Sequence, residues 1–444
     1  MAFYLIENTE QLSTFYYQEF KRAFVEVIPF NDLVHPALNK VSLVYIKPLT
    51  NDDEKGYMIC IDHSEALNVQ IKHVNQVLKS FDEIYVRDKK TFLYYFQLKS
   101  SLDVTHALPT YIHPTTQAHT HFYNTYSSRL DINRIIPIVK HYQRCEEIFE
   151  QVKDHCYTPV DNTNDVLAYS FLFIEKNGIK IDESLFKQYF KPTNESFSIK
   201  DGKIYTQYNL HTTTGRPSNS FNSINFAALN KNNGGRQAFI PEHDRFMEID
   251  ISAYHPNIVA QLVEYKFDKP IYEAFAEYAG VEVKQAKELM FKQLYGGIYT
   301  EYKQWGFFIK VQEYIDKIWE HFETLGWVMV PNSGKYFYKD RLGDMNPQKL
   351  FNYFLQSLET INNARMIKDM TKILKGKNTK LILYVYDSFL FDLDDSEEEI
   401  VEELLDIFDK KGFKVKIKKG TNYDTLKGNR NLEKTQIYDF RTNG

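Results

Sequence analysis

Two aspartates occupy positions where a strand pattern ends, and they are the residues best placed to do chemistry. Asp250 belongs to the segment FMEIDISAYHPN, in which apolar residues alternate with Glu248 and Asp250. This period of two predicts a strand with one apolar face and one face that presents acids. Pro256 suits the first turn of a following helix, so Asp250 should stand between a strand end and a helix start. A divalent cation and a phosphorylated ligand could bind at such a place.

The second aspartate lies in the segment LILYVYDSFLFDL, which spans residues 381–393. Two apolar runs surround Asp387-Ser388, a pattern typical of a β-hairpin whose tip projects a carboxylate. Two aspartates on neighbouring strands can hold two Mg²⁺ ions about 3.5 to 4 Å apart, one activating a primer 3′-OH and one stabilising the leaving pyrophosphate. The pair therefore predicts two-metal nucleotidyl transfer, with Mg²⁺ or Mn²⁺ as the cofactor.

A third segment, KQAKELMFKQLYGG at residues 284–297, predicts a helix that ends at Gly-Gly. Lys287, Phe291 and Tyr295 are spaced by four and share one face, with Lys284 one turn before them. A lysine suits the β- and γ-phosphates of a nucleotide, and an aromatic ring can stack on its base or sugar. The structural alternative is an ordinary core stripe with a lysine that reaches out to solvent.

These segments need a scaffold, and the chain divides into parts that could supply it. Residues 1 to about 110 alternate strand and helix patterns, typical of a small α/β domain. Residues 131–156 predict one long helix, and a second helical segment ends at Asn177-Gly178. In the tail, an acidic helix at 395–408 precedes a basic strand at 413–420, which we expect to be an edge strand.

Composition limits the function less than the motifs do. The 444 residues can form two or three domains, and the formal net charge of -5 means that any nucleic-acid binding must use local basic patches. The three cysteines Cys60, Cys145 and Cys156 are far apart, which disfavours a zinc site or a disulfide framework and fits a reducing, intracellular setting. No apolar run approaches the roughly 18 residues that a membrane span needs, so no membrane partner is expected.

Taken in order, six motifs resemble the polymerase module of family A DNA polymerases, the DNA polymerase I-like group. The motifs lie between about residue 200 and residue 425 and are TGRPS, RQAF, DISAYHPN, K-x7-YG, FNYFLQS and VYDS. The resemblance implies an α/β and α+β multidomain protein, in which an exonuclease-like α/β domain precedes a right-hand polymerase with palm, fingers and a much reduced thumb. It also implies primer-template DNA and dNTPs as partners.

Site residues follow from the same resemblance. It implies that Asp250, Asp387 and Ile251 bind the metals and that Lys287 is catalytic. Residues near the incoming nucleotide would be Arg236, His255, Phe291, Tyr295 and Lys284. Residues that contact the primer-template duplex would be Arg216, Asn225, Asn352 and Gln356.

Three departures from the family pattern bear on the choice of nucleotide. His255 occupies the position of a glutamate that excludes the ribose 2′-OH, and Tyr386-Asp387-Ser388 replaces His-Asp-Glu. Val283 replaces an arginine, which leaves Lys284 or Lys303 as substitutes. We still expect dNTPs to be preferred because Tyr254 and Phe291 could crowd the sugar.

The first domain and the thumb also depart from the family. The acids expected on the first strand of a 3′-5′ exonuclease fall at Val25 and Val27, so the domain should be noncatalytic. Residues 178–182 are followed by Gly202 after only nineteen residues, where the family has a thumb of about a hundred. This resembles a thumbless phage-type member without proofreading and with low processivity, which would need a partner such as a single-stranded DNA-binding protein.

The predicted domains are residues 1–130 for the degenerate exonuclease-like part, 131–205 for a helical connector with a vestigial thumb, and 206–444 for palm and fingers, with the fingers at about 264–345. The expected location is the cytoplasm of a bacterial host, for a phage-encoded protein. Two other functions stay open: an RNA polymerase or primase-like nucleotidyltransferase, and a catalytically inactive DNA-binding replication scaffold.

Overall fold

The computed structural model describes residues 3–16, 20–50, 55–98, 101–103, 120–157, 163–190, 199–219 and 224–427. Contacts divide the chain into two compact units. Unit 1 comprises residues 1–183, 190–211 and 219–225, and unit 2 comprises residues 184–189, 212–218 and 226–444. The finer division at residues 130 and 205 stays a prediction. In the described ranges, no helix is both long and apolar enough to cross a membrane.

Unit 1 is built on a six-stranded sheet with the order β1-β4-β3-β2-β5-β6. Strand β3 runs antiparallel to both of its neighbours, while β1 is parallel to β4, and β2, β5 and β6 are parallel to one another. The strands are β1 (Tyr4–Ile6), β2 (Arg22–Pro29), β3 (Val41–Pro48), β4 (Tyr57–Cys60), β5 (Glu83–Val86) and β6 (Ser101–Asp103). The strand and helix patterns of the first 110 residues therefore form the α/β unit that the sequence predicts.

Helices cover both faces of this sheet. The helices are α1 (Thr9–Tyr16), α2 (Ile71–Ser80), α3 (Lys89–Tyr95), α4 (Thr120–Tyr126), α5 (Ile138–Tyr157) and α6 (Thr163–Asn177). Helices α1, α2 and α3 share one apolar core with Val25 and Ile46, whereas α5 packs on the other face against Phe24 and Tyr45. All three cysteines are buried in this second core or beside it, as free thiols.

The predicted long helix of residues 131–156 begins later than expected, because residues 132–134 form a short 3-10 turn before Pro137 and α5. Helix α6 ends at the predicted Gly178, whose φ of +65° suits a residue without Cβ. Short strands follow: β7 (Ile179–Lys180), β8 (Ile199–Lys200) and β9 (Lys203–Ile204) form a small sheet in the order β7-β9-β8. Helix α7 (Glu183–Tyr189) lies in the same stretch of the chain, and β10 (Tyr208–Asn209) and β11 (Ser218–Asn219) follow as a two-stranded sheet.

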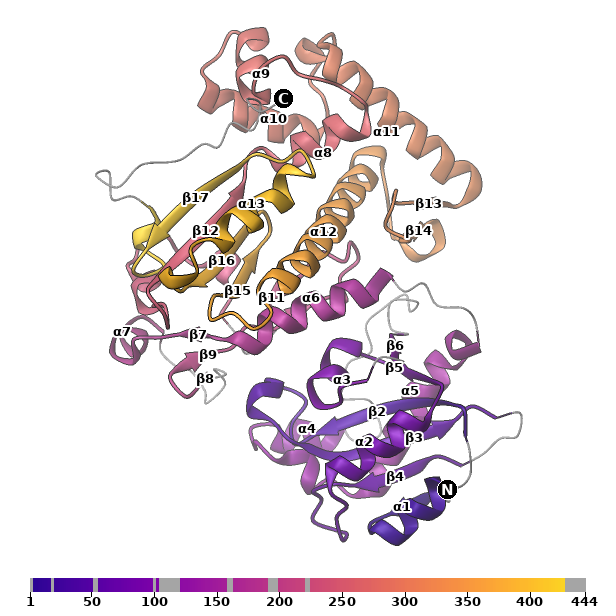
Figure 1. Cartoon of the computed structure of the whole chain (residues 1–444). Helices are drawn as coiled ribbons and strands as arrows, with labels where there is room; N and C mark the ends of the chain where they lie inside the picture. The colour runs from indigo at the N-terminus through magenta and orange to yellow at the C-terminus, as the bar shows by residue number, and fades with distance from the viewer. Residues whose placement is uncertain are drawn as a thin grey trace. The chain divides into compact units, whose positions relative to one another are not determined.

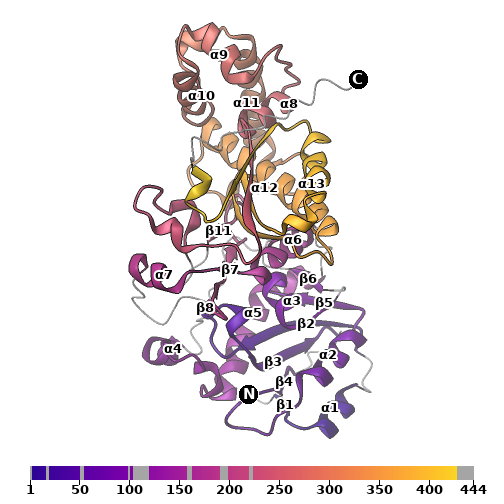
Figure 2. The same cartoon turned by 60° about the vertical axis from the view of Figure 1, so that its left-hand side comes forward.

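Unit 2 contains a four-stranded antiparallel sheet with the order β15-β16-β12-β17. Its strands are β12 (Arg245–Ile251), β15 (Lys380–Val385), β16 (Ser388–Leu393) and β17 (Val415–Gly420). The basic strand β17 lies at the edge, as its sequence predicts. Helices α12 (Pro347–Ile373) and α13 (Ile400–Asp409) cover one face of the sheet (Figures 1 and 2).

The register of the sheet explains which face these helices cover. Tyr384 and Phe389 are direct cross-strand partners, so their side chains point to the same face. Tyr384 accepts a hydrogen bond from Asn363 of α12, and Phe389 packs against Phe408 of α13. Ile249 pairs with Phe389 and shares this buried face, which leaves the neighbouring side chain of Asp250 on the opposite face.

A helical group extends from the same unit between β12 and α12. It consists of α8 (Tyr254–Leu262), α9 (Ile271–Ala279), α10 (Val283–Gly296) and α11 (Gly306–Leu325), followed by the hairpin of β13 (Trp327–Met329) and β14 (Tyr336–Tyr338). Its core is a cluster of aromatic rings: Phe267, Phe275, Trp305, Phe307 and Phe308. Figure 2 shows α9, α10 and α11 gathered at the end of unit 2 where α8 leaves the sheet.

Candidate active site

Strand β12 and helix α8 position the first candidate carboxylate. Asp250 is the penultimate residue of β12 and pairs with Ser388 of β16 on one side and Lys416 of β17 on the other. Ala253 adopts a left-handed conformation with φ of +50°, and this turn sends the chain directly into α8. The strand end and helix start that the sequence predicts therefore flank Asp250.

The hairpin of β15 and β16 positions the second carboxylate. The residues at its tip are Tyr386 and Asp387, so Ser388 begins the returning strand instead of sharing the tip as the sequence suggested. Tyr386 has φ of +57°, which allows the two-residue turn. The main-chain oxygen of Asp387 accepts a hydrogen bond from the nitrogen of Ile251 at 2.9 Å, which fixes the tip against the end of β12.

Asp250 is half-buried, whereas Asp387 at the hairpin tip is exposed yet partly desolvated by the protein around it. Burial, together with the neighbouring carboxylate of Asp387, raises the pKa of Asp250 to about 6. Burial likewise raises the pKa of Asp387. Across the described residues, no lysine, arginine or histidine forms an ion pair with either aspartate, although Lys418 and Lys416 lie near enough to lower the pKa of Asp250 slightly. The arrangement concentrates negative charge that a cation would stabilise.

Helix α10 places its aromatic residues as the spacing predicts. The rings of Phe291 and Tyr295 are stacked, with centroids 5.9 Å apart and planes within 3° of parallel. Lys284 and Lys287 are exposed on the preceding turns, where their ammonium groups can meet a ligand. Lys303, the other substitute cation, is exposed just beyond the 3-10 turn that follows α10. The lysine and aromatic face is therefore present on one helix.

A chain of polar contacts joins α10 to α8 and α12. The hydroxyl of Tyr295 is hydrogen-bonded to Nδ1 of His255, and Nε2 of His255 lies 3.1 Å from the carboxylate of Glu359. The imidazole of His255 therefore lies between the Tyr295 hydroxyl and the Glu359 carboxylate. Glu359 also pairs with Arg216, with 3.0 Å between Nε and Oε2. The guanidinium of Arg216 lies over the ring of Tyr386, 3.8 Å from its centroid.

Glu359 is the member of this network that the sequence did not reveal. It is 1% exposed, yet the FNYFLQS motif that precedes it gives no sign of a buried acid. A possible signal was its place on the helix, since Glu359 stands three residues after Gln356 and seven after Asn352. The prediction that Tyr254 crowds the sugar is wrong. Tyr254 is buried, and its hydroxyl donates a hydrogen bond to Asn363 at 2.7 Å, so its ring does not reach the open face of the sheet.

The residues expected to contact a primer-template duplex are only partly gathered. Arg216 lies in the network above, and Gln356 accepts a hydrogen bond from Thr214 of the TGR loop at 3.2 Å. Asn352 donates to the main-chain oxygen of Tyr295 at 2.9 Å, which ties α12 to α10. Asn225 is an exposed residue of unit 1. Contact with nucleic acid stays a prediction for all four.

Arg236 is held by its own loop. Its guanidinium is buried over the ring of Tyr423, 4.5 Å from the centroid, and donates to the main-chain oxygen of Leu229. These contacts anchor residues 226–239 to the end of the sheet. A role for Arg236 near the triphosphate therefore stays a prediction that would need the side chain to leave Tyr423.

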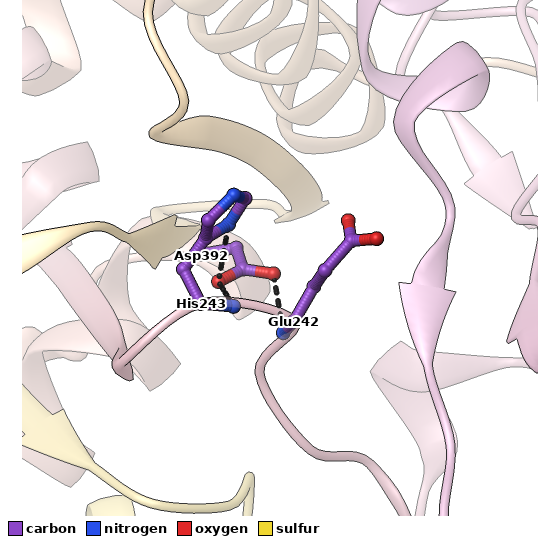
Figure 3. A group of neighbouring side chains, drawn as sticks. All are labelled: Glu242, His243 and Asp392. Atoms are coloured by element: carbon purple, nitrogen blue, oxygen red, sulfur yellow. Dashed lines mark hydrogen bonds and ion pairs between the residues drawn. The ribbon is translucent and has the colours of Figure 1, made fainter.

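A second group of acids and histidine lies at the other end of β16. The ligand atoms of Glu242, His243 and Asp392 all fall within 4.8 Å of one another. Asp392 accepts hydrogen bonds from the main-chain nitrogens of Glu242 and His243 at 2.7 and 3.0 Å, and from Nδ1 of His243 at 3.3 Å. Figure 3 shows the Glu242 carboxylate extending away from Asp392. These bonds make Asp392 an anchor for the loop before β12.

Unit 1 contains buried acids of a different kind. The Glu26 carboxylate is paired with Arg87 at 2.6 Å, and Asp32 lies 3.4 Å from Arg144, a side chain with no exposed surface. The Tyr123 hydroxyl also donates to Asp32. Val25 on β2 is buried in the apolar core and Val27 packs partly buried beside it, as expected of residues that bind no metal. Both buried carboxylates thus have guanidinium partners.

The donor set of unit 2 fits Mg²⁺ or Mn²⁺. Asp250 at the end of β12 and Asp387 at the adjoining hairpin tip offer hard oxygen ligands. The pKa values of both carboxyls are raised, so a bound cation would stabilise their charged forms. Ile251 has a buried side chain, so only its main-chain oxygen could serve as a ligand. The assignment of these three as ligands stays a prediction.

Comparison with known proteins adds evidence on the fold. No family model matches the chain, and no curated protein sequence matches it. Among solved structures, the chain is similar to the POL domain of Pol1 from M. smegmatis in complex with DNA primer-template and dNTP. The TM-score is 0.68 at 14% sequence identity, over 95% of this chain and 99% of that chain. The chain therefore has the fold of a DNA polymerase domain.

Proposed function

We propose that this protein is a template-directed DNA polymerase that extends a primer 3′-OH with dNTPs. The observation that carries the proposal is a pair of aspartates without an ion-pair partner in the described part of the chain: Asp250 at the end of β12 and Asp387 at the adjoining hairpin tip of a polymerase fold. Two bound Mg²⁺ ions would activate the 3′-OH and neutralise the charge that develops on the triphosphate. The chain's own part is to hold these carboxylates rigidly through the β12–β16 pairing and the hydrogen bond from Ile251 to the Asp387 main chain.

Helix α10 supplies the nucleotide side of the proposed reaction. Lys287, with Lys284 one turn before it, would bind the phosphates as a point charge, and the stacked rings of Phe291 and Tyr295 would pack against base and sugar. His255 would face the sugar edge while Tyr295 and Glu359 fix its orientation. We expect this arrangement to prefer dNTPs over rNTPs.

We propose, from the six motifs, that the protein is a thumbless phage-type member of family A. Nineteen residues stand where the family has a thumb, so the chain lacks many phosphate contacts to the duplex behind the site. We therefore propose low intrinsic processivity and retention through a partner such as a single-stranded DNA-binding protein. Because Glu26 and Asp32 are neutralised by arginines, we also propose that unit 1 has no 3′-5′ exonuclease activity.

Primer extension on a DNA template with Mg²⁺ tests the proposal. Asp250→Ala and Asp387→Ala should each lower incorporation by about a thousandfold or more, because metal ions supply several kcal/mol of transition-state stabilisation. Affinity for the primer-template should change little, since phosphate contacts come from other residues. Glu403→Ala, which removes an exposed acid on α13, is the matched control. Near wild-type incorporation by either aspartate variant would refute the two-metal assignment.

The same assay separates the alternatives. Faster extension with rNTPs than with dNTPs at equal concentration would favour an RNA polymerase or primase, a possibility raised by His255 and by Asp387-Ser388. A wild-type protein that binds primer-template but adds no nucleotide of either kind would favour the inactive scaffold. Single-encounter product lengths, with and without a single-stranded DNA-binding protein, measure the proposed dependence on a partner.

A further inference from the structure

The β13–β14 hairpin of unit 2 has one buried face and one aromatic, exposed face. Val328 pairs with Phe337, and both are buried, with Phe337 packed against Tyr353 of α12. The alternate residues point the other way. Met329, Tyr336 and Tyr338 are 44%, 41% and 37% exposed, which is unusual for three large side chains on one short hairpin.

The exposed rings are arranged as a platform. Tyr336 and Tyr338 are stacked, with centroids 6.0 Å apart and an interplanar angle of 22°. Trp327 lies beside them, 5.5 Å from Tyr336, and is itself buttressed edge-on by His321 of α11. Three neighbouring rings on a sheet face can receive successive bases, since every base has a π-face.

A guanidinium lies against these rings. The guanidinium of Arg341 lies 4.7 Å from the centroid of Tyr338, where it can reach a phosphate while it stacks. Lys339 pairs with Glu323 at the rim, and Asp340 is the other exposed acid between the two cations. Lys335 occupies the turn of the hairpin. Burial lowers the pKa of Lys335 to about 7, and its Nζ packs on the TGR loop, so Arg341 is the cation that lies against the exposed rings. A guanidinium stacked on aromatic rings suits a nucleic-acid strand better than an apolar protein partner.

The turn of the hairpin is continuous with the candidate active site. A Cβ on Gly215 would lie 3.2 Å from the Lys335 Nζ, so this lysine is packed against the TGR loop. Arg216, the next residue in that loop, covers Tyr386 at the tip that carries Asp387. Arg365 of α12 donates to the main-chain oxygen of Asn332, which holds the turn in place. A strand that stacks on the hairpin therefore lies beside the elements of the site.

We propose that the exposed face of this hairpin, formed by Trp327, Met329, Tyr336 and Tyr338, binds single-stranded DNA by base stacking. The identification of that strand as unpaired template rests on the proposed function, whereas the stacking surface itself does not. Such a surface compensates in part for the contacts that a thumb would make, because it holds the strand outside the duplex.

Fluorescence anisotropy with a fluorescein-labelled oligothymidylate, without metal or nucleotide, tests the surface separately from catalysis. Tyr336→Ala combined with Tyr338→Ala should weaken binding at least about tenfold, since stacking contributes roughly 1 to 3 kcal/mol per base. The corresponding double Phe variant keeps the rings and should bind as wild type does. Tyr126→Ala, which removes an equally exposed tyrosine of unit 1, should change nothing.

Two further readouts keep the test decisive. An oligonucleotide of abasic sites should bind wild type as weakly as oligothymidylate binds the double Ala variant, because it lacks bases to stack. Oligothymidylate should also quench tryptophan fluorescence, and Trp327→Phe should remove most of the quenching. Unchanged affinity in a double Ala variant with a wild-type melting temperature would overturn the proposal, as would equal affinity for the abasic strand. If binding meets these expectations but primer extension fails, the proposed function falls and the surface stands.

Discussion

The acids Glu26 and Asp32 of unit 1 and the acids Asp250 and Asp387 of unit 2 lie in opposite electrostatic surroundings. In unit 1, Glu26 and Asp32 are each paired with a guanidinium that is itself almost or fully buried. In unit 2, Asp250 and Asp387 share the end of a sheet with no ion-pair partner within the described residues, and burial raises the pKa of both. A paired acid contributes to the fold, whereas an unpaired one destabilises it until a ligand arrives. The charge balance around each acid therefore distinguishes acids that stabilise the fold from acids that are available to bind a ligand.

Arg144→Met in unit 1 should have the largest effect and tests the comparison most directly. Loss of the guanidinium removes the ion pair with Asp32 and the longer contact with Glu26, and we expect about 3 to 5 kcal/mol of lost stability. Urea unfolding measures the loss. Arg129→Met, which removes a half-exposed arginine of the same unit, should cost less than about 1 kcal/mol. If Arg144→Met also costs that little, the pairing in unit 1 is not structural.

A second variant tests whether the effect of an acid on stability depends on its charged partners or on the unit in which it lies. Glu359 lies in unit 2 but is paired, with Arg216 and His255, so Glu359→Gln should destabilise the protein as a unit 1 variant would. The expected loss is about 2 to 3 kcal/mol, the usual value of hydrogen bonds to a charged group. Glu323→Gln, at an exposed pair with Lys339, is the control. If Glu359→Gln stabilises the protein, acids near this sheet destabilise the fold even when they have charged partners.

Asp250→Asn should stabilise the protein, whereas Glu359→Gln should destabilise it. The pKa of Asp250 is about 6 in the fold and near 3.8 when unfolded, so the folded state holds the proton more tightly and loses stability as pH rises between these values. Above pH 6 without metal, the variant should be more stable than wild type by about 2 kcal/mol, and below pH 4 the difference should vanish. Thermal unfolding across pH measures it. Asp369→Asn, at an exposed pair, should show no such pH dependence.

The smallest expected effect is stabilisation by the metal itself. At about ten times its Kd, free Mg²⁺ should raise the stability of the wild-type protein by about 1.4 kcal/mol. Asp250→Asn should abolish this gain, whereas Glu26→Gln should retain it, even though it lowers the starting stability. Differential scanning calorimetry with and without Mg²⁺ gives the answer. A gain that depends on Glu26 would move the metal site to unit 1.

The sequence predicts those parts of the site that follow from the periodicity of residues close together along the chain. Alternation in FMEIDIS places Asp250 on the open face of a strand, and the spacing by four places Phe291 and Tyr295 on one helix face. Both follow from local periodicity, which tertiary packing preserves. The hairpin was recognised for the same reason, although its tip is shifted to Tyr386-Asp387.

Long-range pairing accounts for what the sequence could not predict. Helix α12 buries residues all around its circumference, so no apolar stripe distinguishes an inward-facing Glu359 from an exposed glutamate. Its partners Arg216 and His255 lie more than a hundred residues away along the chain. The Asp32, Tyr123 and Arg144 cluster is similarly dispersed. Val25 and Val27 occupy the positions of metal-binding acids, and the local sequence does not indicate that the neighbouring Glu26 and Asp32 are paired with arginines.

The buried cysteines make the protein suitable for site-specific labelling. All three lie in unit 1, and burial raises the pKa of Cys60 and of Cys156 to about 12 and also raises that of Cys145 well above its usual value. Only the thiolate reacts with maleimides, so these groups should label about a thousandfold more slowly than an exposed thiol. Cysteines introduced at the exposed Glu288 of α10 and Glu403 of α13 could then carry a donor and an acceptor fluorophore in an otherwise native background. Any movement of α10 during the proposed nucleotide addition would become visible in single molecules.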